Sequence, residues 1–486
     1  MLSAEMVEER SRSVNPQRGL GWGLAIWMAL AAAGCGTFSH YPEGMEQTTL
    51  APLRTGQRPD YQKTFEKRTN GNAGVLFAME LGRVAQLEGD PEASRRAFAA
   101  AIAGTAAQDD KAAISASGAA AQGGAVLVND KVIPYRAPSH ERILVHHYQA
   151  LNHLALSDVE GAGVEIRRAN REQEDARARR DAEIEKSKSA EANVAPDEER
   201  DPNLLPVYAG LDELAGAVKH SFQNAATFYL SAVVWEMLGE PNDAYIDCKK
   251  ALEIYPENPY LQRDVLRLGR RLGMREDVAD FERRFPEAAR EAAPETNAAR
   301  LVVFYEEGLA PKKSEMSVSY PLFSSESVGV VALPVYAEAP PPAMPACVRA
   351  GRRNVGTTAP ICDVSALAAR ALAEQMPGIL TRQLARAVAK AAAAKVAKDQ
   401  GNSWAELAVT LYNVVSEQAD LRSWLTLPAH IQMLGAWVEP GTRAVALTGP
   451  GGAIWSGEVT FRPGRTTLVC VTRIDLAVYS HVIMQP

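Results

Sequence analysis

Cys35 is the residue whose chemistry the sequence defines best. It follows three alanines and a glycine in the stretch LAAAGC at 30–35. A lipoprotein signal peptidase needs small residues before such a cysteine, because the thiol is lipidated in a tight membrane pocket. Ala33 and Gly34 meet this need, whereas Ala32 stands where leucine is more common. We therefore predict that Cys35 is lipidated and becomes the first residue of the mature chain.

The residues before Cys35 have the layout of an export signal. A stretch with three arginines precedes fifteen uncharged residues at 20–34. Such a run is too short to cross a bilayer comfortably and fits the apolar part of a signal peptide. We predict a lipoprotein signal peptide at 1–34. An ordinary signal peptide, or a membrane anchor with an incidental cysteine, is the alternative, and acidic residues near the start leave open a later translation start.

Gly36 bears on the compartment. In Gram-negative bacteria an aspartate after the lipidated cysteine commonly retains a lipoprotein in the inner membrane, and this chain has glycine there. The sequence therefore predicts a lipid-anchored protein of the outer membrane that faces the periplasm. Residues 35–70 are polar and rich in turn formers, which predicts a flexible tether.

Two histidines, His146 and His153, raise the question of a metal site. They stand seven residues apart, on one face of an expected helix. That spacing is two helical turns, too far for both to hold one zinc ion without a third element, and no H-E-x-x-H motif is present. We predict a structural role for both histidines, and no metal and no cofactor for the chain.

The cysteines after residue 35 form no C-x-x-C pair. Cys347 and Cys362 stand fifteen residues apart in a proline-rich region, and an exported protein could join them in a disulfide. A loop of this size would contribute about 3 kcal/mol by chain-entropy arguments. Two free thiols are the alternative, and the sequence leaves both open. Cys248 and Cys470 are expected to be buried.

No catalytic motif emerges from the remaining polar residues. The G-x-S-x-G motif is absent, and GPGG at 449–452 lacks the Lys-Ser/Thr of a phosphate loop and predicts a β-turn. In DLRSWLTLP at 420–428, Asp420 and Arg422 are expected to form an ion pair at a helix end. Trp424 is expected to seal a junction between helices and sheet. A binding role for Arg422 and Trp424 is the alternative.

Helical repeats are the elements expected to position these residues. Gly239, Ala244, Ala251 and Pro256 have the spacing G-x4-A-x6-A-x4-P, which resembles the tetratricopeptide repeat. Small residues let two antiparallel helices approach closely, and glycine and proline end them. The same phase recurs three more times, at Gly82, Gly89, Ser94, Phe98 and Ala101, at Ala150, Ser157, Ala162 and Ala169, and at Gly273. Stacked repeats form a concave groove, and we expect His146, His153, Phe228 and Trp235 to line or flank it for a partner.

The expected fold class is α+β. A repeat domain at 71–297 carries a charged helical extension at 167–203, a mixed strand and helix region follows at 298–425, and a small antiparallel β-domain closes the chain at 426–486. Pro377 is expected to break the helix at 363–399 into two. With 486 residues and a net charge of −7, the chain is not expected to bind nucleic acid.

Several long phrases are similar to a family of uncharacterised bacterial lipoproteins with tetratricopeptide-like repeats. The phrases are NDKVIPYRAPSHERILVHHYQALNHLAL, SFQNAATFYLSAVVWEMLGEPNDAYIDCKKALEIYPENPYLQRD, YEEGLAPKK and ADLRSWLTLPAHIQ. The chain departs from the family at His153 and Cys248, where aromatic residues are more common. The resemblance implies an envelope lipoprotein with a helical-repeat half and a mixed C-terminal half, and it implies no established activity.

These features predict a periplasmic scaffold that binds envelope proteins or peptides and is held at the membrane by its N-terminal lipid. One alternative is a structural subunit of a multi-protein envelope complex. Another is an enzyme acting on envelope polymers, with its site in the C-terminal half. The sequence offers no nucleophile, paired acid or metal cluster for such an enzyme, so no catalytic residue is assigned.

Overall fold

The computed structural model describes residues 40–58, 65, 68–117, 134–190, 205–291, 297–321, 328–399 and 418–486. The predicted signal peptide and Cys35 lie outside these residues. Among the helices that are described, none is long and apolar enough to cross a membrane. The mixture of helix and sheet confirms the expected α+β class.

Consecutive helices form four hairpins in the described part of the chain. They are α5 (Gly74–Leu87) with α6 (Pro91–Ser117), α8 (Ser139–Ala155) with α9 (Val159–Ala190), α11 (Ala225–Leu238) with α12 (Pro241–Ile254), and α13 (Pro259–Leu272) with α14 (Arg275–Arg284). Each hairpin packs against the next, and the short helix α15 (Pro286–Arg290) follows the last. Gly239 and Gly273 end α11 and α13 with φ of 81° and 72°, which confirms that glycine closes these helices. The predicted charged extension is helical as far as Ala190, and 191–203 lie outside the described residues.

The predicted tether is helical over part of its length. Residues 41–55 form α2 (Tyr41–Met45), the π-helix η1 (Glu46–Leu50) and α3 (Ala51–Thr55). Leu50 and Leu53 are buried in the main core, and the Tyr41 hydroxyl donates a hydrogen bond of 2.8 Å to Glu80. The expectation of a flexible tether is therefore wrong for 41–55, because apolar residues at helical spacing pack this segment against the body.

Five strands form the central sheet, in the order β11-β10-β1-β7-β6. They are β1 (Ala299–Glu307), β6 (Ala359–Asp363), β7 (His430–Val438), β10 (Thr466–Ile474) and β11 (Ala477–Met484). β1 pairs parallel with β10 and antiparallel with β7. The prediction of a separate antiparallel domain at 426–486 is therefore wrong. Two strands from this range, β7 and β10, flank β1. β1 is buried over eight of its nine residues, as expected for a central strand.

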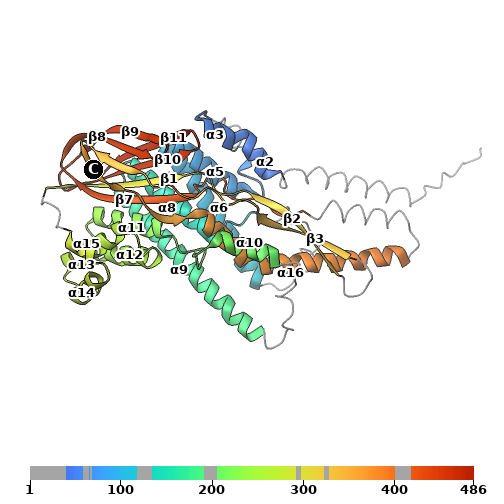
Figure 1. Ribbon diagram of the computed structural model, residues 1–486. Helices are drawn as coiled ribbons and strands as arrows, with labels where there is room; N and C mark the ends of the chain where they lie inside the picture. The colour runs from blue at the N-terminus through green and yellow to red at the C-terminus, as the bar shows by residue number, and fades with distance from the viewer. Residues whose placement is uncertain are drawn as a thin grey trace, which may run out of the picture.

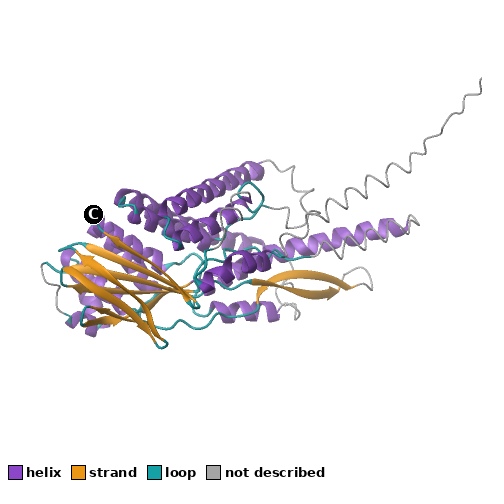
Figure 2. Ribbon diagram, turned by 90° about the horizontal axis from the view of Figure 1, so that it is seen from above, coloured by secondary structure: helices purple, strands orange, loops and turns teal. Residues whose placement is uncertain are grey.

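A second sheet packs on the central sheet. It has the order β5-β4-β8-β9 and consists of β4 (Cys347–Ala350), β5 (Arg353–Thr357), β8 (Gly441–Gly449) and β9 (Gly452–Phe461). β9 contacts β1, β10 and β11, while helices α8, α11 and α13 contact strands of the central sheet. Figures 1 and 2 show the strands gathered against the helices. The central sheet is therefore an inner layer, with helices on one face and the second sheet on the other.

An arm extends from this body (Figure 1). The hairpin of β2 (Lys313–Pro321) and β3 (Val328–Tyr336) packs with α10 (Leu205–Ala215) and α16 (Val364–Asp399) around a small core of its own. Pro377 lies inside α16, which is one continuous helix, so the predicted break is wrong. A proline removes one backbone hydrogen bond, but the buried Leu372 and Met376 hold the helix against the hairpin just before it.

Candidate functional site

One face of β1 carries buried charges toward the helices. Successive residues of a strand point to opposite faces, so Arg300, Phe304 and Glu306 share one face. Arg300 is 5% exposed and Glu306 is 6% exposed. A charge at such depth destabilises the fold unless a partner compensates it. The charged partners of both residues lie on the first helices of the hairpins.

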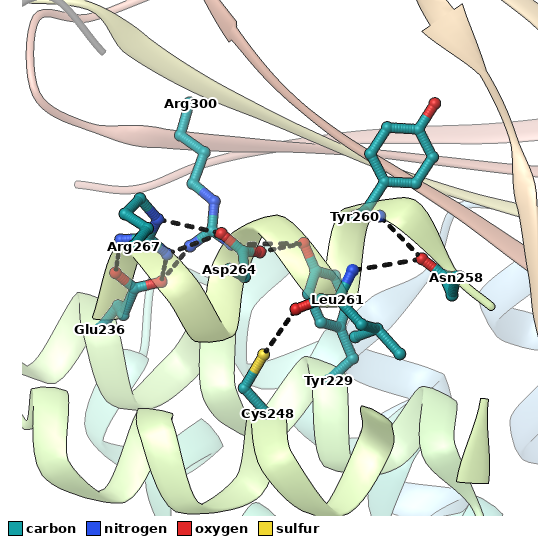
Figure 3. Close-up of polar contacts among 9 residues, drawn as sticks. All are labelled: Tyr229, Glu236, Cys248, Asn258, Tyr260, Leu261, Asp264, Arg267 and Arg300. Carbon is teal, nitrogen blue, oxygen red and sulfur yellow. Dashed lines mark hydrogen bonds and ion pairs between the residues drawn. The ribbon is translucent and has the colours of Figure 1, made fainter. Parts of the chain in front are cut away.

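Arg300 is the centre of a closed group of ion pairs, the Arg300 cluster, which consists of Arg300, Arg267, Glu236, Asp264 and Tyr229 (Figure 3). Arg300 donates to Glu236, to Asp264 at 2.6 Å and to the Tyr229 hydroxyl at 3.2 Å. Arg267 donates two hydrogen bonds to Glu236, at 2.7 and 2.8 Å, and others to Asp264. Two arginines therefore face two carboxylates, and strand β1 is joined to both α11 and α13.

The cluster holds its own charges in place. Burial acts to raise the pKa of Glu236, but Arg300 and Arg267 outweigh it and hold that pKa at about 2. Burial likewise acts to lower the pKa of Arg300, and the carboxylates of Asp264 and Glu236 raise it instead. Each arginine is committed to carboxylates of this chain, so the cluster offers no open site for an anionic ligand.

Glu306 forms a second group, the Glu306 cluster, with Arg83, Tyr148 and Thr472. It accepts hydrogen bonds from the Tyr148 hydroxyl at 2.8 Å and the Thr472 hydroxyl at 2.6 Å, and it is paired with Arg83. The Arg83 guanidinium also lies 4.2 Å from the centre of the Tyr148 ring. Burial acts to raise the pKa of Glu306, but the Arg83 charge and the two hydroxyls lower it overall. This cluster joins β1 and β10 to α5 and α8.

A small cavity of about 50 Å³ adjoins the Glu306 cluster. Its lining includes charged, titratable and hydroxyl side chains, namely those of Arg83, His147, Glu306, Cys470, Thr472 and His481. Burial raises the pKa of the Cys470 thiol to about 12 and lowers that of His147 to about 4, so both are uncharged at neutral pH. The volume corresponds to roughly one or two water molecules. It does not admit a sugar or peptide unit, which weighs against an enzyme of envelope polymers at this place.

The DLRSWLTLP segment is held by two buried carboxylates from the helices. The backbone N–H of Trp424 donates to Glu141 at 2.9 Å, and those of Leu425 and Thr426 donate to Glu80 at 2.8 and 3.2 Å. Burial raises the pKa of Glu80 to about 7 and also raises that of Glu141. Carboxylates thus satisfy three consecutive backbone donors that no helix or strand pairs.

Trp424 fills the space that these hydrogen bonds enclose. Its ring lies 5.8 Å from Phe98 and 6.0 Å from Tyr148, and it is 1% exposed, so it packs as expected rather than serving as an exposed anchor. Asp420 and Arg422 form the expected ion pair, at 2.6 Å. They do so in a segment that is neither helix nor strand, and the residues just before it, 400–417, lie outside the described part of the chain.

The residues predicted to line a groove do not line one. His146 is buried and 2.6 Å from Glu165, and the Trp235 indole donates to Asp247 at 3.0 Å. Phe228 is buried under Lys250, and His153 pairs with Asp158 at 2.8 Å. These four residues contact the second helix of a hairpin or the turn that leads to it. The prediction is wrong by about one helical position, since His147 and Tyr229, next in sequence to His146 and Phe228, face the sheet.

The structure gives Cys347 and Cys362 as free thiols. Cys347 donates to Asn354 at 3.5 Å within the second sheet, whereas Cys362 is buried in β6 of the central sheet. Cys248 is buried as predicted, and Cys470 is only partly buried. Among the described residues, no group of three or more histidines, cysteines or acidic residues is placed to hold a metal ion.

Comparison with known proteins returns no match. No protein-family model matches the chain, and no match was found among curated proteins or solved structures. The roles assigned to the two clusters therefore depend on their geometry and not on a relative. The sequence did carry one signal for them, because Arg300 interrupts an apolar run that Glu306 ends, and Glu80 interrupts another in LFAMEL.

Proposed function

We propose that this chain is a lipid-anchored protein of the outer membrane, facing the periplasm, that works as a structural subunit of a multi-protein envelope complex. In this proposal the four hairpins are tetratricopeptide-like repeats. The sequence context of Cys35 supports the anchor, and the spacing of glycine, alanine and proline supports the repeats. The similarity to the lipoprotein family is a further expectation of the same kind.

One observation favours a structural subunit over a scaffold that binds its partner in the groove. In repeat scaffolds of this type the concave face of the first helices receives a partner. Here that face is occupied by the chain's own β1 through the Arg300 and Glu306 clusters. A partner peptide would have to displace buried ion pairs to enter, and breaking such pairs is strongly destabilising. Contacts with other proteins would therefore fall on the outer surfaces.

A second candidate function keeps the scaffold role but moves it to the outer side of the last two hairpins. A groove of about 570 Å³ lies between α12 and α14, with Leu252 and Phe281 among its lining residues. Its four acidic side chains outnumber two basic ones, which favours a basic peptide. The acidic residues are Glu253, Glu276, Asp277 and Asp280, and the basic ones are Lys249 and Arg284.

Site-specific crosslinking in the native envelope tests the proposal. A photoreactive residue at Ile246, which is 49% exposed on α12, should capture an envelope protein that mass spectrometry can identify. The same residue at the buried Tyr229 should give only links within the chain. Capture at Tyr229 but not at Ile246 would favour the groove-binding scaffold, and recovery of no envelope protein from any exposed position would refute both.

A Cys35→Ala variant tests the anchor separately. Without the acylated thiol the chain should leave the outer-membrane fraction and appear in the soluble fraction. If the variant still fractionates with the outer membrane, lipidation of Cys35 is not the attachment.

A further inference from the structure

Strand β11 (Ala477–Met484) is an edge of the central sheet. It pairs with β10 on one side. Within the described residues, no backbone hydrogen bond joins its other side to another segment. An edge of this kind presents a row of unpaired N–H and C=O groups that can accept another strand.

The side chains of β11 leave this edge unguarded. Natural proteins block sheet edges with charged residues, prolines or bulges. The other edge of the same sheet, β6, is blocked in this way, because it is five residues long, contains Pro360 and has an irregular register at that point. By contrast, residues 476–484 contain no lysine, arginine, aspartate or glutamate.

Apart from Ser480 at its centre, the face of β11 that points away from the helices is apolar and exposed. Val478, Val482 and Met484 are 37%, 40% and 42% exposed, and Leu476, at the turn before the strand, is 90% exposed. On the opposite face, His481 and Ile483 line the small cavity beside the helices. The alternation of strand residues therefore puts an apolar row on the open side, next to the unpaired backbone.

We propose that β11 pairs antiparallel with β11 of a second copy of this chain, about a two-fold axis at Ser480. The sequence LAVYSHVIM has nearly the same apolar pattern read in either direction from Ser480. Pairing about this residue places Val478 opposite Val482 of the second copy and Leu476 opposite Met484 of the second copy. Each copy then buries the exposed row of the other, and the two central sheets become continuous.

The self-complementary pattern is the reason to choose a second copy over a different partner. A two-fold interface requires each surface to match itself, residue for residue. In this register every pair on the exposed face joins two apolar side chains or two serines, and no charges of like sign meet. The inference is independent of the proposed function, because it needs neither the lipid nor a partner from the envelope.

Disulfide trapping of the full chain tests the register. Directly opposite residues of an antiparallel pair have Cα atoms about 4.5–5.5 Å apart, which suits a disulfide. Under a mild oxidant, Ser480→Cys should form a covalent dimer at least about tenfold faster than Glu458→Cys, an exposed position on β9. The unsubstituted chain measures the background from the natural cysteines. Equal rates for the two variants would overturn the proposal.

A charge on the edge provides the second test. Val482→Lys places a lysine in both Val478–Val482 pairs of the dimer, so the dissociation constant should rise about tenfold or more. Ile246→Lys, on the exposed side of α12, should leave it unchanged. Analytical ultracentrifugation of the full chain in detergent gives both values. A chain that is monomeric throughout, or a Ser480→Cys product in the envelope with the mass of another protein, would contradict pairing with a second copy.

Discussion

Strands β1 and β11 belong to one sheet, but the buried strand carries charged side chains and the edge strand carries exposed apolar ones. β1 lies at the centre and is buried, yet its helix-facing side carries Arg300 and Glu306. β11 lies at the edge, yet its open side carries the exposed Val478, Val482 and Met484, with the exposed Leu476 in the turn before it. The two strands therefore differ in where their interaction partners lie. The charges of β1 are compensated within the chain, whereas nothing described in the chain covers the apolar row of β11.

The two clusters also fix how the sheet sits on the helices. Arg300 and Glu306 are six residues apart, which is roughly 20 Å along a strand. Arg300 pairs with α11 and α13, and Glu306 pairs with α5 and α8. A shift of the sheet would leave charges unpaired at both ends. Buried ion pairs of this kind are a weak source of net stability, so we infer that they specify the docked arrangement.

The largest effect is expected from Arg300→Ala. The substitution leaves the buried carboxylates of Glu236 and Asp264 with Arg267 as their one remaining arginine. We expect the free energy of unfolding to fall by about 3–5 kcal/mol. Urea denaturation measures it. Arg349→Ala is the matched control, since Arg349 is exposed on β4 and its loss should cost less than about 0.5 kcal/mol. Similar small effects for both would show that the Arg300 cluster does not hold β1.

A smaller loss is expected from Arg83→Met. Methionine keeps much of the volume, and Glu306 retains the hydroxyl donors of Tyr148 and Thr472. We expect a loss of about 2–3 kcal/mol, because a buried carboxylate loses its cation. Adding Glu306→Gln should cost less than the sum of the two single losses, by about 1 kcal/mol or more. Additive losses in the same urea series would contradict a direct pairing.

Glu80→Gln tests a buried contact of the helices through the pH dependence of the free energy of unfolding. A glutamine has one acceptor oxygen where Glu80 has two, so a backbone donor in the 424–426 segment loses its partner. The free energy of unfolding should fall by about 1–3 kcal/mol. The pKa of Glu80 is raised by burial from 4.5 to about 7 in the fold. Its protonation therefore stabilises the fold fully below pH 4.5, and this contribution is lost as pH rises through 7.

Other groups titrate in the same range, so the two pH profiles must be subtracted. His147, whose pKa is lowered by burial to about 4, acts in the opposite sense and loses stability as pH falls below 6.5. It is present in both chains and cancels in the difference. The stability of the parent chain relative to Glu80→Gln should decline between pH 4.5 and 7 and level off above that range. A difference that does not vary with pH would refute the assignment.

The smallest effect is expected at the edge. Val482→Lys should change the stability of the dilute chain by no more than about 0.5 kcal/mol, because Val482 is exposed in the single copy. The melting temperature of the parent chain should rise with protein concentration, as pairing of two copies requires, and that of the variant should not. Differential scanning fluorimetry over a dilution series shows this. A parent melting temperature that is independent of concentration would remove the contrast between β1 and β11.

Local features of the fold could be predicted from the sequence. The glycines at 239 and 273 marked the ends of α11 and α13, and ARLVVFYEEG marked β1. These predictions depend on backbone conformation and hydrophobic pattern within a few residues. DLRSWLTLP also stood out as a packing segment, and Trp424 is buried as expected.

The clusters could not be predicted, because they depend on pairings distant in sequence. β1 pairs with β10 across more than 150 residues, and no local pattern in either strand specifies the other. The groove prediction placed His146 and Phe228 toward an open face, because nothing in the sequence pattern of the helices shows that a later strand covers that face. Glu80 and Glu141 lie within helical patterns, and their role depends on loop donors near residue 425.

Hydrogen exchange of the full chain tests most directly whether the sheet permanently occupies the inner face of the helices. If the clusters dock β1 as a fixed part of the fold, the amides of β1 should exchange as slowly as those of α8 and α11, in one cooperative unit. If α8 and α11 stay protected while β1 and β10 exchange much faster, the sheet leaves the helices, and the inner face is open to a partner.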